Sequence, residues 1–501
     1  MTRRHPRSNR ARSLSALAVL VLLGFEGARV RAQESWDAIY LGGSKIGYIH
    51  VFVEAVKDRG RDYLRVRIDN ELRLKRRDDV AVTKLMYGTI ETLDGQVLKL
   101  DTRTQAGNLQ DLRAHGNVID GEMKLIVESG GQEQSLTIPW GPEVRGPYAP
   151  EQSMARKPLK ENETRPLRMF IPELNKVCDV QLRARTIQPV LLGDGSKRAL
   201  LRVDQTTVVD GKPRPEYDAR VYVDAEGQVL KSEQDVMGGI VMYRTNKQDA
   251  MAPGGPVQFD LILDTVVKVS RRIPDPEQTR HVKYRITLKG SEPAEVIPND
   301  LRQTIVPDAS KTTAGLEVRS AGPLDGTPST EEVDPQYLRP NALVTSQDTR
   351  VRGLAQRVTR GVVAPWDKAT RINHWVHENI KNKNFKVAFA AANAVAQNLS
   401  GDCTEHAVLA AAMNRAVGIP SRVVIGLIYV DDLEGFGYHM WNEVFVNHRW
   451  VALDPSWDQS AVDAVHIKIS DSSLDGVSPF EAFLPLVRVM GRLGIEPIEL
   501  R

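Results

Sequence analysis

Two strand-like runs on either side of Asn447-His448 restrict the fold of this chain more than any other feature. If Asn447-His448 is a two-residue hairpin turn, Val446 pairs with Arg449. In that register, His439 and Asp454 are diagonal neighbours on one face of the sheet. Such neighbours are about 7–8 Å apart at the backbone, within reach of an imidazole–carboxylate hydrogen bond. A slip of one residue would place them on opposite faces. The spacing therefore predicts a base held by an acid.

The segment 401–407, Gly-Asp-Cys-Thr-Glu-His-Ala, reads as the start of an apolar helix. Asp402 suits the N-cap and Glu405 follows three residues later, which is the pattern of a capping box. Gly418-Ile419-Pro420 is expected to end the helix. Cys403 then occupies the first turn, where unpaired N–H groups and the helix dipole favour a thiolate and can stabilise an oxyanion.

Four sequence blocks occur together in an order and spacing that resemble the transglutaminase-like superfamily: Gly401-Asp402-Cys403, Gly418-Ile419-Pro420-Ser421-Arg422, His439-Met440-Trp441-Asn442-Glu443 and Trp450-Val451-Ala452-Leu453-Asp454-Pro455. The resemblance covers about residues 350–501. It implies an α+β papain-like domain in which a helix carries the cysteine and an antiparallel sheet carries the histidine and the aspartate. By position, it implies that Cys403 is the nucleophile, His439 the general base and Asp454 the residue that orients the imidazole.

The chemistry implied is acyl transfer from a protein or peptide amide through a thioester, without a cofactor. Release of the thioester to water (peptidase, amidase or deamidase) or to an amine (transglutaminase) stays open. Gln397 is a candidate side-chain oxyanion donor, although a surface polar residue is the simpler interpretation. His406 forms Cys-x-x-His with Cys403, but no further ligands of suitable spacing follow, so we expect no metal site and a locally hydrogen-bonded histidine. His466 is interpreted as a strand residue.

The chain has only two cysteines. A nucleophilic Cys403 must stay free, which leaves Cys178 as a small buried apolar residue. A Cys178–Cys403 disulfide is the alternative.

Residues 1–32 read as a signal peptide, with an arginine-rich start, an apolar stretch at 14–25 and Val30-Arg31-Ala32 as a cleavage site. The apolar stretch is too short for a membrane anchor. We therefore expect an exported protein, periplasmic or extracellular, without stable membrane insertion. Removing this segment takes away seven arginines and one glutamate, which turns the net charge of +3 into −3. Nothing in that charge predicts nucleic-acid binding, and the sequence says nothing of the oligomeric state.

The region before the helical part alternates in the manner of long antiparallel strands, with turns such as Asp58-Arg59-Gly60. The pentapeptide Gly-Gln-Val-Leu-Lys occurs at 95–99 and at 227–231, each time after an acidic turn. This repetition favours two related β units. The fold class predicted is thus multidomain: an N-terminal all-β antiparallel region followed by the α+β domain.

The predicted division is a signal peptide, a β-rich domain, a second β-rich domain, a Pro- and Gly-containing linker and the transglutaminase-like domain, at 1–32, 33–150, 151–300, 301–345 and 346–501. Trp366–Ile380 and Pro479–Leu493 are expected to be amphipathic helices. No motif with chemistry occurs in 33–330. The alternative to an enzyme is therefore a non-catalytic envelope assembly or binding module that keeps the transglutaminase-like fold.

Overall fold

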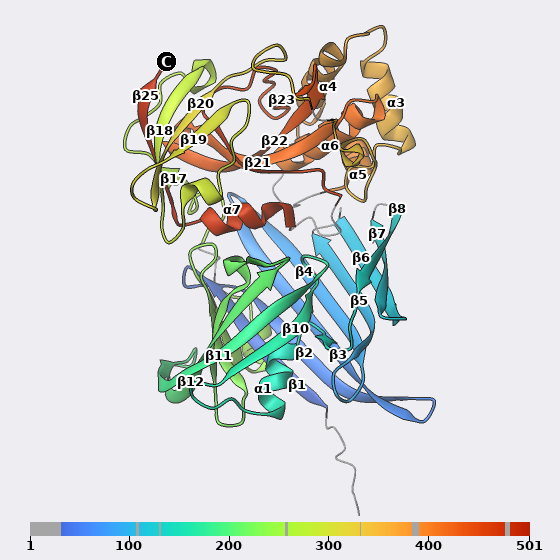
Figure 1. Ribbon diagram of the computed structural model, residues 1–501, viewed down its shortest axis with the longest axis vertical. Coiled ribbons are helices and arrows are strands. Elements are labelled where there is room, and N and C mark those ends of the chain that lie inside the picture. The colour runs from blue at the N-terminus through green and yellow to red at the C-terminus, as the bar shows by residue number, and fades with distance from the viewer. Residues whose placement is uncertain are drawn as a thin grey trace, which may run out of the picture.

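The computed structural model describes residues 32–106, 110–129, 132–255, 259–330, 332–382, 390–475 and 481–501. The expected signal peptide lies outside these ranges except for its last residue. The chain forms an N-terminal β-sheet and a C-terminal domain of helices and smaller sheets, which stands over one end of the large sheet (Figure 1). Within the described ranges, no helix has the length and apolar character needed to cross a membrane.

The N-terminal part is a single sheet built of sixteen strands among the described residues. The strands run in two meanders, which meet where β1 pairs antiparallel with β16. The order along the sheet is β8-β7-β6-β5-β4-β3-β2-β1-β16-β15-β14-β12-β11-β10-β9, with β13 beside β12. The elements of this part are β1 Gln33–Leu41, β2 Ser44–Asp58, β3 Arg61–Arg76, β4 Asp79–Glu91, β5 Val97–Ala106, β6 Gln110–Ile119, β7 Glu122–Ser129, β8 Gln132–Pro139, β9 Val144–Arg145, α1 Ala149–Arg156, β10 Thr164–Ile171, β11 Lys176–Leu191, β12 Lys197–Val209, β13 Lys212–Pro213, η1 Pro215–Tyr217, β14 Ala219–Val223, β15 Val229–Gln234, β16 Ile240–Thr245 and α2 Lys247–Met251.

The alternation in the sequence decides which face of each strand is buried. In β3, Leu64 and Val66 are buried, whereas Arg65 and Arg67, which alternate with them, are exposed. The two copies of the pentapeptide both follow tight turns and lead into strands, β5 and β15. The strands of the two predicted β regions nevertheless belong to one hydrogen-bonded sheet. This sheet curls on itself, so side chains of β5–β7 share a core with Phe170 of β10.

The C-terminal domain contains a five-stranded sheet in the order β17-β22-β21-β24, with β23 paired to β22. Helix α6 packs on β21 and β22, and α3, α4 and α5 pack around α6. Side chains along nearly the whole of α6 are buried, so it is the central helix of the domain. These elements are β17 Val267–Lys268, η2 Pro276–Gln278, η4 Pro335–Tyr337, α3 Thr349–Val358, α4 Pro365–Asn379, α5 Ala392–Asn398, α6 Cys403–Ala416, β21 Ser421–Val430, η5 Asp431–Leu433, β22 Gly435–Val446, β23 Arg449–Leu453 and β24 His466–Ser472.

A four-stranded sheet of order β19-β20-β18-β25 closes the domain on its other side: β18 His281–Leu288, η3 Pro293–Glu295, β19 Gln303–Pro307, β20 Thr313–Arg319 and β25 Leu493–Leu500. The stretch expected to be a linker, 301–345, thus contributes β19 and β20. Their apolar side chains join the core that also contains α6. The linker prediction failed because the segment that directly follows these short strands is rich in proline and glycine.

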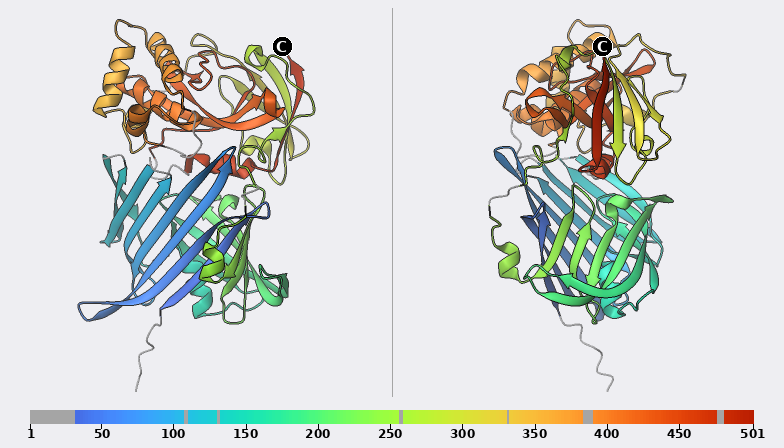
Figure 2. Two further views of the ribbon diagram at one scale, coloured as in Figure 1. Left: turned by 180° about the vertical axis from the view of Figure 1, so that it is seen from behind. Right: turned by 90° about the vertical axis from the view of Figure 1, so that its left-hand side faces the viewer.

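The two parts meet along α7 (Leu484–Val489), which follows η6 (Glu481–Phe483) and runs between them in two views (Figures 1 and 2). Leu484 packs against the core of the large sheet, and the Arg488 Nε lies 3.7 Å from the buried carboxylate of Glu216. The predicted helix at 479–493 is therefore shorter, because the chain turns at Gly491 into β25; residues 479–480 lie outside the described ranges. The helix predicted at 366–380 agrees with α4.

Candidate active site

Helix α6 begins at Cys403 with the predicted cap. Asp402 is the N-cap, and its Oδ1 accepts hydrogen bonds from the backbone N–H and the hydroxyl of Thr404 at 2.8 and 2.7 Å. The Glu405 Oε2 accepts from the Asp402 N–H at 2.9 Å, which completes the capping box. Gly401 has φ of +151°, and a Cβ at this position would lie 2.4 Å from the side chain of Glu405. The turn before Cys403 therefore requires glycine.

The hairpin of β22 and β23 has the predicted register, with Val446 opposite Arg449. Both turn residues, Asn447 and His448, have positive φ, 50° and 59°. The register brings the Nε2 of His439 to 2.6 Å from the Oδ2 of Asp454.

Asp454 is fully buried and accepts hydrogen bonds at both oxygens. Its Oδ1 accepts from the backbone N–H groups of Ser456 and Trp457 at 2.7 and 3.3 Å. Its Oδ2 faces the Nε2 of His439 and the Nε2 of His466. Burial alone would raise the pKa of this carboxyl, but the two histidines and their hydrogen bonds hold it well below its usual range. Asp454 therefore stays ionised.

His466 is a residue of this site that the sequence reading missed. Its Nε2 lies 3.1 Å from the Asp454 Oδ2, and its Nδ1 lies 2.6 Å from the Oδ1 of Asp463. Two ionised carboxylates can only accept, so both ring nitrogens are satisfied only when the imidazole is protonated. Burial opposes that charge, but Asp463 and Asp454 raise the pKa of His466. The only sequence signal was an aspartate three residues before a strand histidine.

Cys403 and His439 line the same pocket. Burial lowers the pKa of His439, but the charge and hydrogen bond of Asp454, together with a hydrogen bond from Cys403, raise it to about 9. Because Nε2 faces Asp454, Nδ1 is the ring nitrogen left to exchange a proton with the sulfur. The structure thus brings together all three residues that the sequence singled out.

A cation from the N-terminal sheet reaches the start of α6. The Nη2 of Arg76, at the end of β3, lies 2.7 Å from the Asp402 Oδ2, and both side chains are largely buried. Burial opposes the charge of Arg76, but the charges of Asp402, Cys403 and Glu405 raise its pKa. The guanidinium therefore acts on the N-cap and on the sulfur beside it. No motif in the sequence pointed to this residue.

The other residues considered from the sequence, Gln397, His406 and Cys178, have no part in the proposed triad. Gln397 is exposed on α5 and does not line the pocket beside Cys403. The Nδ1 of His406 lies 2.7 Å from the carbonyl oxygen of Asp402, a local hydrogen bond. Both cysteines are free, and Cys178 is buried in the core of the large sheet, which raises its pKa to about 12. The disulfide alternative is therefore wrong.

His439, Asp454 and His466 lie close enough to be considered as metal ligands, with one ligand atom of each within 4.8 Å of the others. Direct hydrogen bonds between the imidazoles and the carboxylate account for this spacing. We therefore interpret the group as a hydrogen-bond network.

Residues 352–455 match the family model of the transglutaminase-like superfamily. This part of the chain belongs to that superfamily. The matched residues run from α3 to the end of the hairpin, so they include the capped helix, the histidine and the aspartate. The transglutaminase-like domain is accompanied here by a large β-sheet outside the matched region. No curated protein matches the chain.

Solved structures show distant similarities. A candidate cysteine protease from Cytophaga hutchinsonii is 14% identical, with 44% of this chain and 86% of that chain covered and a TM-score of 0.29. A beta-barrel-like protein of a domain of unknown function from Brucella abortus is 13% identical, with 42% and 96% covered and a TM-score of 0.31. The periplasmic domain of TgpA from Pseudomonas aeruginosa is 15% identical, with 36% and 92% covered and a TM-score of 0.22. At these scores, the similarities carry no argument about function.

Proposed function

We propose that the protein is an exported cysteine acyltransferase or hydrolase that acts on protein or peptide amides through Cys403, His439 and Asp454. The observation that carries the proposal is the 2.6 Å contact of His439 with a buried, ionised carboxylate, while Cys403 at the start of α6 lines the same pocket as His439. Together these positions favour an ion pair of thiolate and imidazolium.

In the proposed reaction, the Cys403 thiolate attacks the carbonyl carbon of the amide. The backbone N–H of Cys403 has no hydrogen-bond partner among the described residues and is free to donate to the oxyanion. His439 then gives its Nδ1 proton to the leaving nitrogen as the C–N bond breaks and the thioester remains. Asp454 keeps the Nε2 proton in place, so the imidazole accepts and donates at Nδ1.

The thioester is resolved by water or by a second amine, with His439 as the base that takes the incoming proton. Incubation of the mature protein with casein and a fluorescent amine tests transamidation. Peptide cleavage and ammonia release test hydrolysis. Both reactions should disappear in Cys403→Ala and persist in Cys178→Ala, which removes the other cysteine.

Labelling with iodoacetamide gives a test that needs no substrate. The sulfur displaces iodide, and we expect the adduct at Cys403 and none at the buried Cys178. An unreactive Cys403, or amide chemistry that continues in Cys403→Ala, would reject the proposal. Full rescue of a deletion phenotype by Cys403→Ala would instead support a non-catalytic envelope module.

A further inference from the structure

A pocket of about 400 Å³ lies between the N-terminal sheet and the transglutaminase-like domain, with Cys403 and His439 in its lining. Ligand sites in proteins usually have volumes of about 300–1,000 Å³. The pocket therefore has room for a large side chain beside a carbonyl group placed at the sulfur.

The wall on the side of the large sheet is mainly apolar. It is formed by Leu74 of β3, Ala81 of β4, Met237, and the neighbouring residues Leu261 and Ile262. These residues come from three separate parts of the chain, all outside the region that matches the superfamily model. The matched region alone would leave this side of the pocket open.

The C-terminal domain adds further apolar residues to the lining. Leu433 follows the end of β21, and Leu486, Val487 and Met490 belong to α7 or follow it directly. Burial of a leucine or phenylalanine side chain among these residues is favourable because it removes apolar surface from water.

The charges of the lining discriminate against a basic substrate group. Among the described residues, Asp402 is the only carboxylate in the lining, and Arg76 already occupies its Oδ2. Arg77 also lines the pocket and is exposed, and its side chain has no ion-pair partner among the described residues. A lysine or arginine entering the pocket would meet two cations and no unpaired carboxylate.

We propose that this pocket receives a bulky apolar side chain of the acyl donor, and that the N-terminal sheet thereby selects the substrate of Cys403. The inference rests on the proposed function, since it assigns a substrate class to the same nucleophile. The sheet is then part of the enzyme's specificity.

The test compares three peptidyl fluoromethyl ketones that carry phenylalanine, alanine or lysine next to the reactive carbon. In each reaction the Cys403 sulfur displaces fluoride and forms a thioether, which mass spectrometry of the full mature chain quantifies. We expect the phenylalanine reagent to react about ten- to a hundredfold faster than the alanine reagent, the factor that burial of one such side chain supplies. The lysine reagent should react more slowly than the phenylalanine reagent.

Leu261→Asp and Leu263→Asp form a matched pair of variants. Leu261 lines the pocket, whereas Leu263 lies two residues away, is 44% exposed and does not line it. We expect Leu261→Asp to lose most of the preference for phenylalanine and to react faster with the lysine reagent. Leu263→Asp should behave as the unchanged protein, and the iodoacetamide rate of each variant serves to normalise its ketone rates for the reactivity of the sulfur.

Labelling by iodoacetamide without discrimination among the three ketones would overturn this inference and leave the proposed function intact. A Leu261→Asp variant with unchanged preference would overturn it as well. If iodoacetamide fails to label Cys403, the proposed function falls, and this inference falls with it.

Discussion

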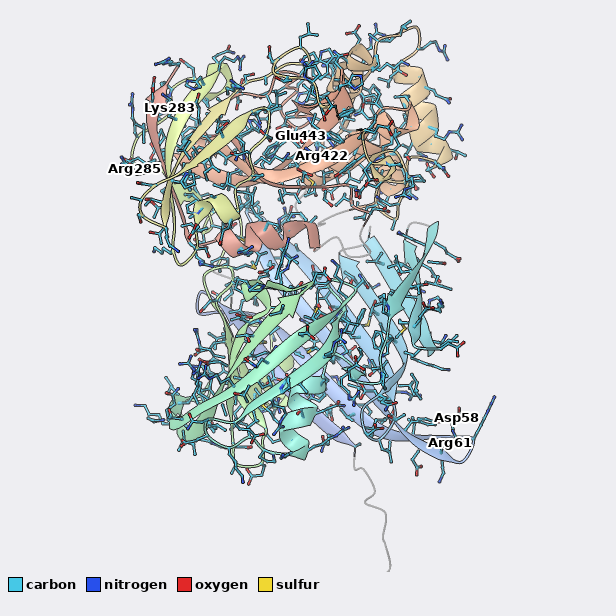
Figure 3. All side chains as sticks on the ribbon, in the orientation of Figure 1. Asp58, Arg61, Lys283, Arg285, Arg422 and Glu443 are labelled. Carbon is cyan, nitrogen blue, oxygen red and sulfur yellow. The ribbon has the colours of Figure 1, made fainter. Side chains whose placement is uncertain are left out.

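One ion pair of the large sheet and one of the transglutaminase-like domain lie in opposite environments. On the sheet, Arg65 and Glu54 form a cross-strand pair at 2.9 Å with side chains 55% and 32% exposed. In the domain, Lys468 and Glu443 form a pair at 2.9 Å with side chains 3% and 4% exposed. Figure 3 shows the same contrast: Asp58 and Arg61 lie at the far tip of a hairpin, whereas Arg422 and Glu443 lie inside the upper domain.

Buried charges need partners, so a domain that contains many of them is specified by polar contacts as well as by packing. Lys468 and Arg422 both contact Glu443, and together they lower its pKa to about 2 although burial acts in the opposite direction. Asp454 is held in the same way by two histidines. Charge is thus fixed beside the proposed chemistry, whereas the Arg65–Glu54 pair of the sheet stays in solvent. The following predictions test this contrast.

The largest effect is expected for Asp454→Asn, which removes the charge that fixes His439. We expect the reaction of Cys403 with a peptidyl fluoromethyl ketone to slow by about 10²–10⁴-fold, the usual range for loss of an oriented base. Asp458→Asn is the control, since Asp458 pairs with His374 at the surface. A normal rate in Asp454→Asn would show that the carboxylate does not orient the base.

Lys468→Met should destabilise the domain by about 3–5 kcal/mol, because it leaves Glu443 buried with fewer partners. Arg65→Met on the sheet should change stability by less than about 1 kcal/mol. Chemical denaturation of both variants gives the two free energies of unfolding. Equal losses would remove the distinction between the two regions.

The pH dependence of stability follows from His439, whose pKa is raised to about 9. Its stabilising contribution is complete below about pH 6.5, the ordinary value of a free histidine, and is lost as the pH rises through about 9. The contribution amounts to at most about 3 kcal/mol. The free energy of unfolding of His439→Gln should vary less over this interval, and NMR of the imidazole should show a lower pKa in Cys403→Ala. A histidine that titrates near 6.5 would contradict the arrangement.

The smallest effect on the site is expected for Arg76→Gln, which removes the cation supplied by the sheet. A thiolate loses a favourable neighbour, so labelling of Cys403 by iodoacetamide should slow, and its pH profile should move to higher pH. Arg73→Gln, an exposed position on the same strand, should leave the profile unchanged. Identical profiles for both variants would confine the role of Arg76 to contact between the two parts.

The local parts of the site could be predicted from the sequence. A two-residue turn fixes the register of β22 and β23, and a capping box fixes the start of α6, so Cys403, His439 and Asp454 follow from neighbouring residues. His466 and Arg76 could not be found in this way. Arg76 is 326 residues from Asp402, and no periodicity links residues so far apart.

The same limit applies to the fold. Alternation predicted the antiparallel strands, but the pairing of β1 with β16 joins segments far apart in sequence and makes one sheet of two regions. The short strands β19 and β20 alternate between buried and exposed residues. Nearby prolines and glycines nevertheless led to the prediction of a linker. Local rules thus identify strands, whereas tertiary packing decides which strands become neighbours.

Strand β25 pairs with β18, which precedes it by more than two hundred residues, as in the Arg285–Glu496 contact across 211 positions. During synthesis, one edge of β18 therefore stays unpaired until most of the domain has been made and β25 follows. Such distant pairing slows folding and leaves a bare strand edge in the meantime. A fragment that begins at residue 346 would carry β25 without that partner. A useful expression boundary consequently lies before β17, near residue 260. Until β25 is made, the unpaired edge of β18 is a site that a chaperone could bind.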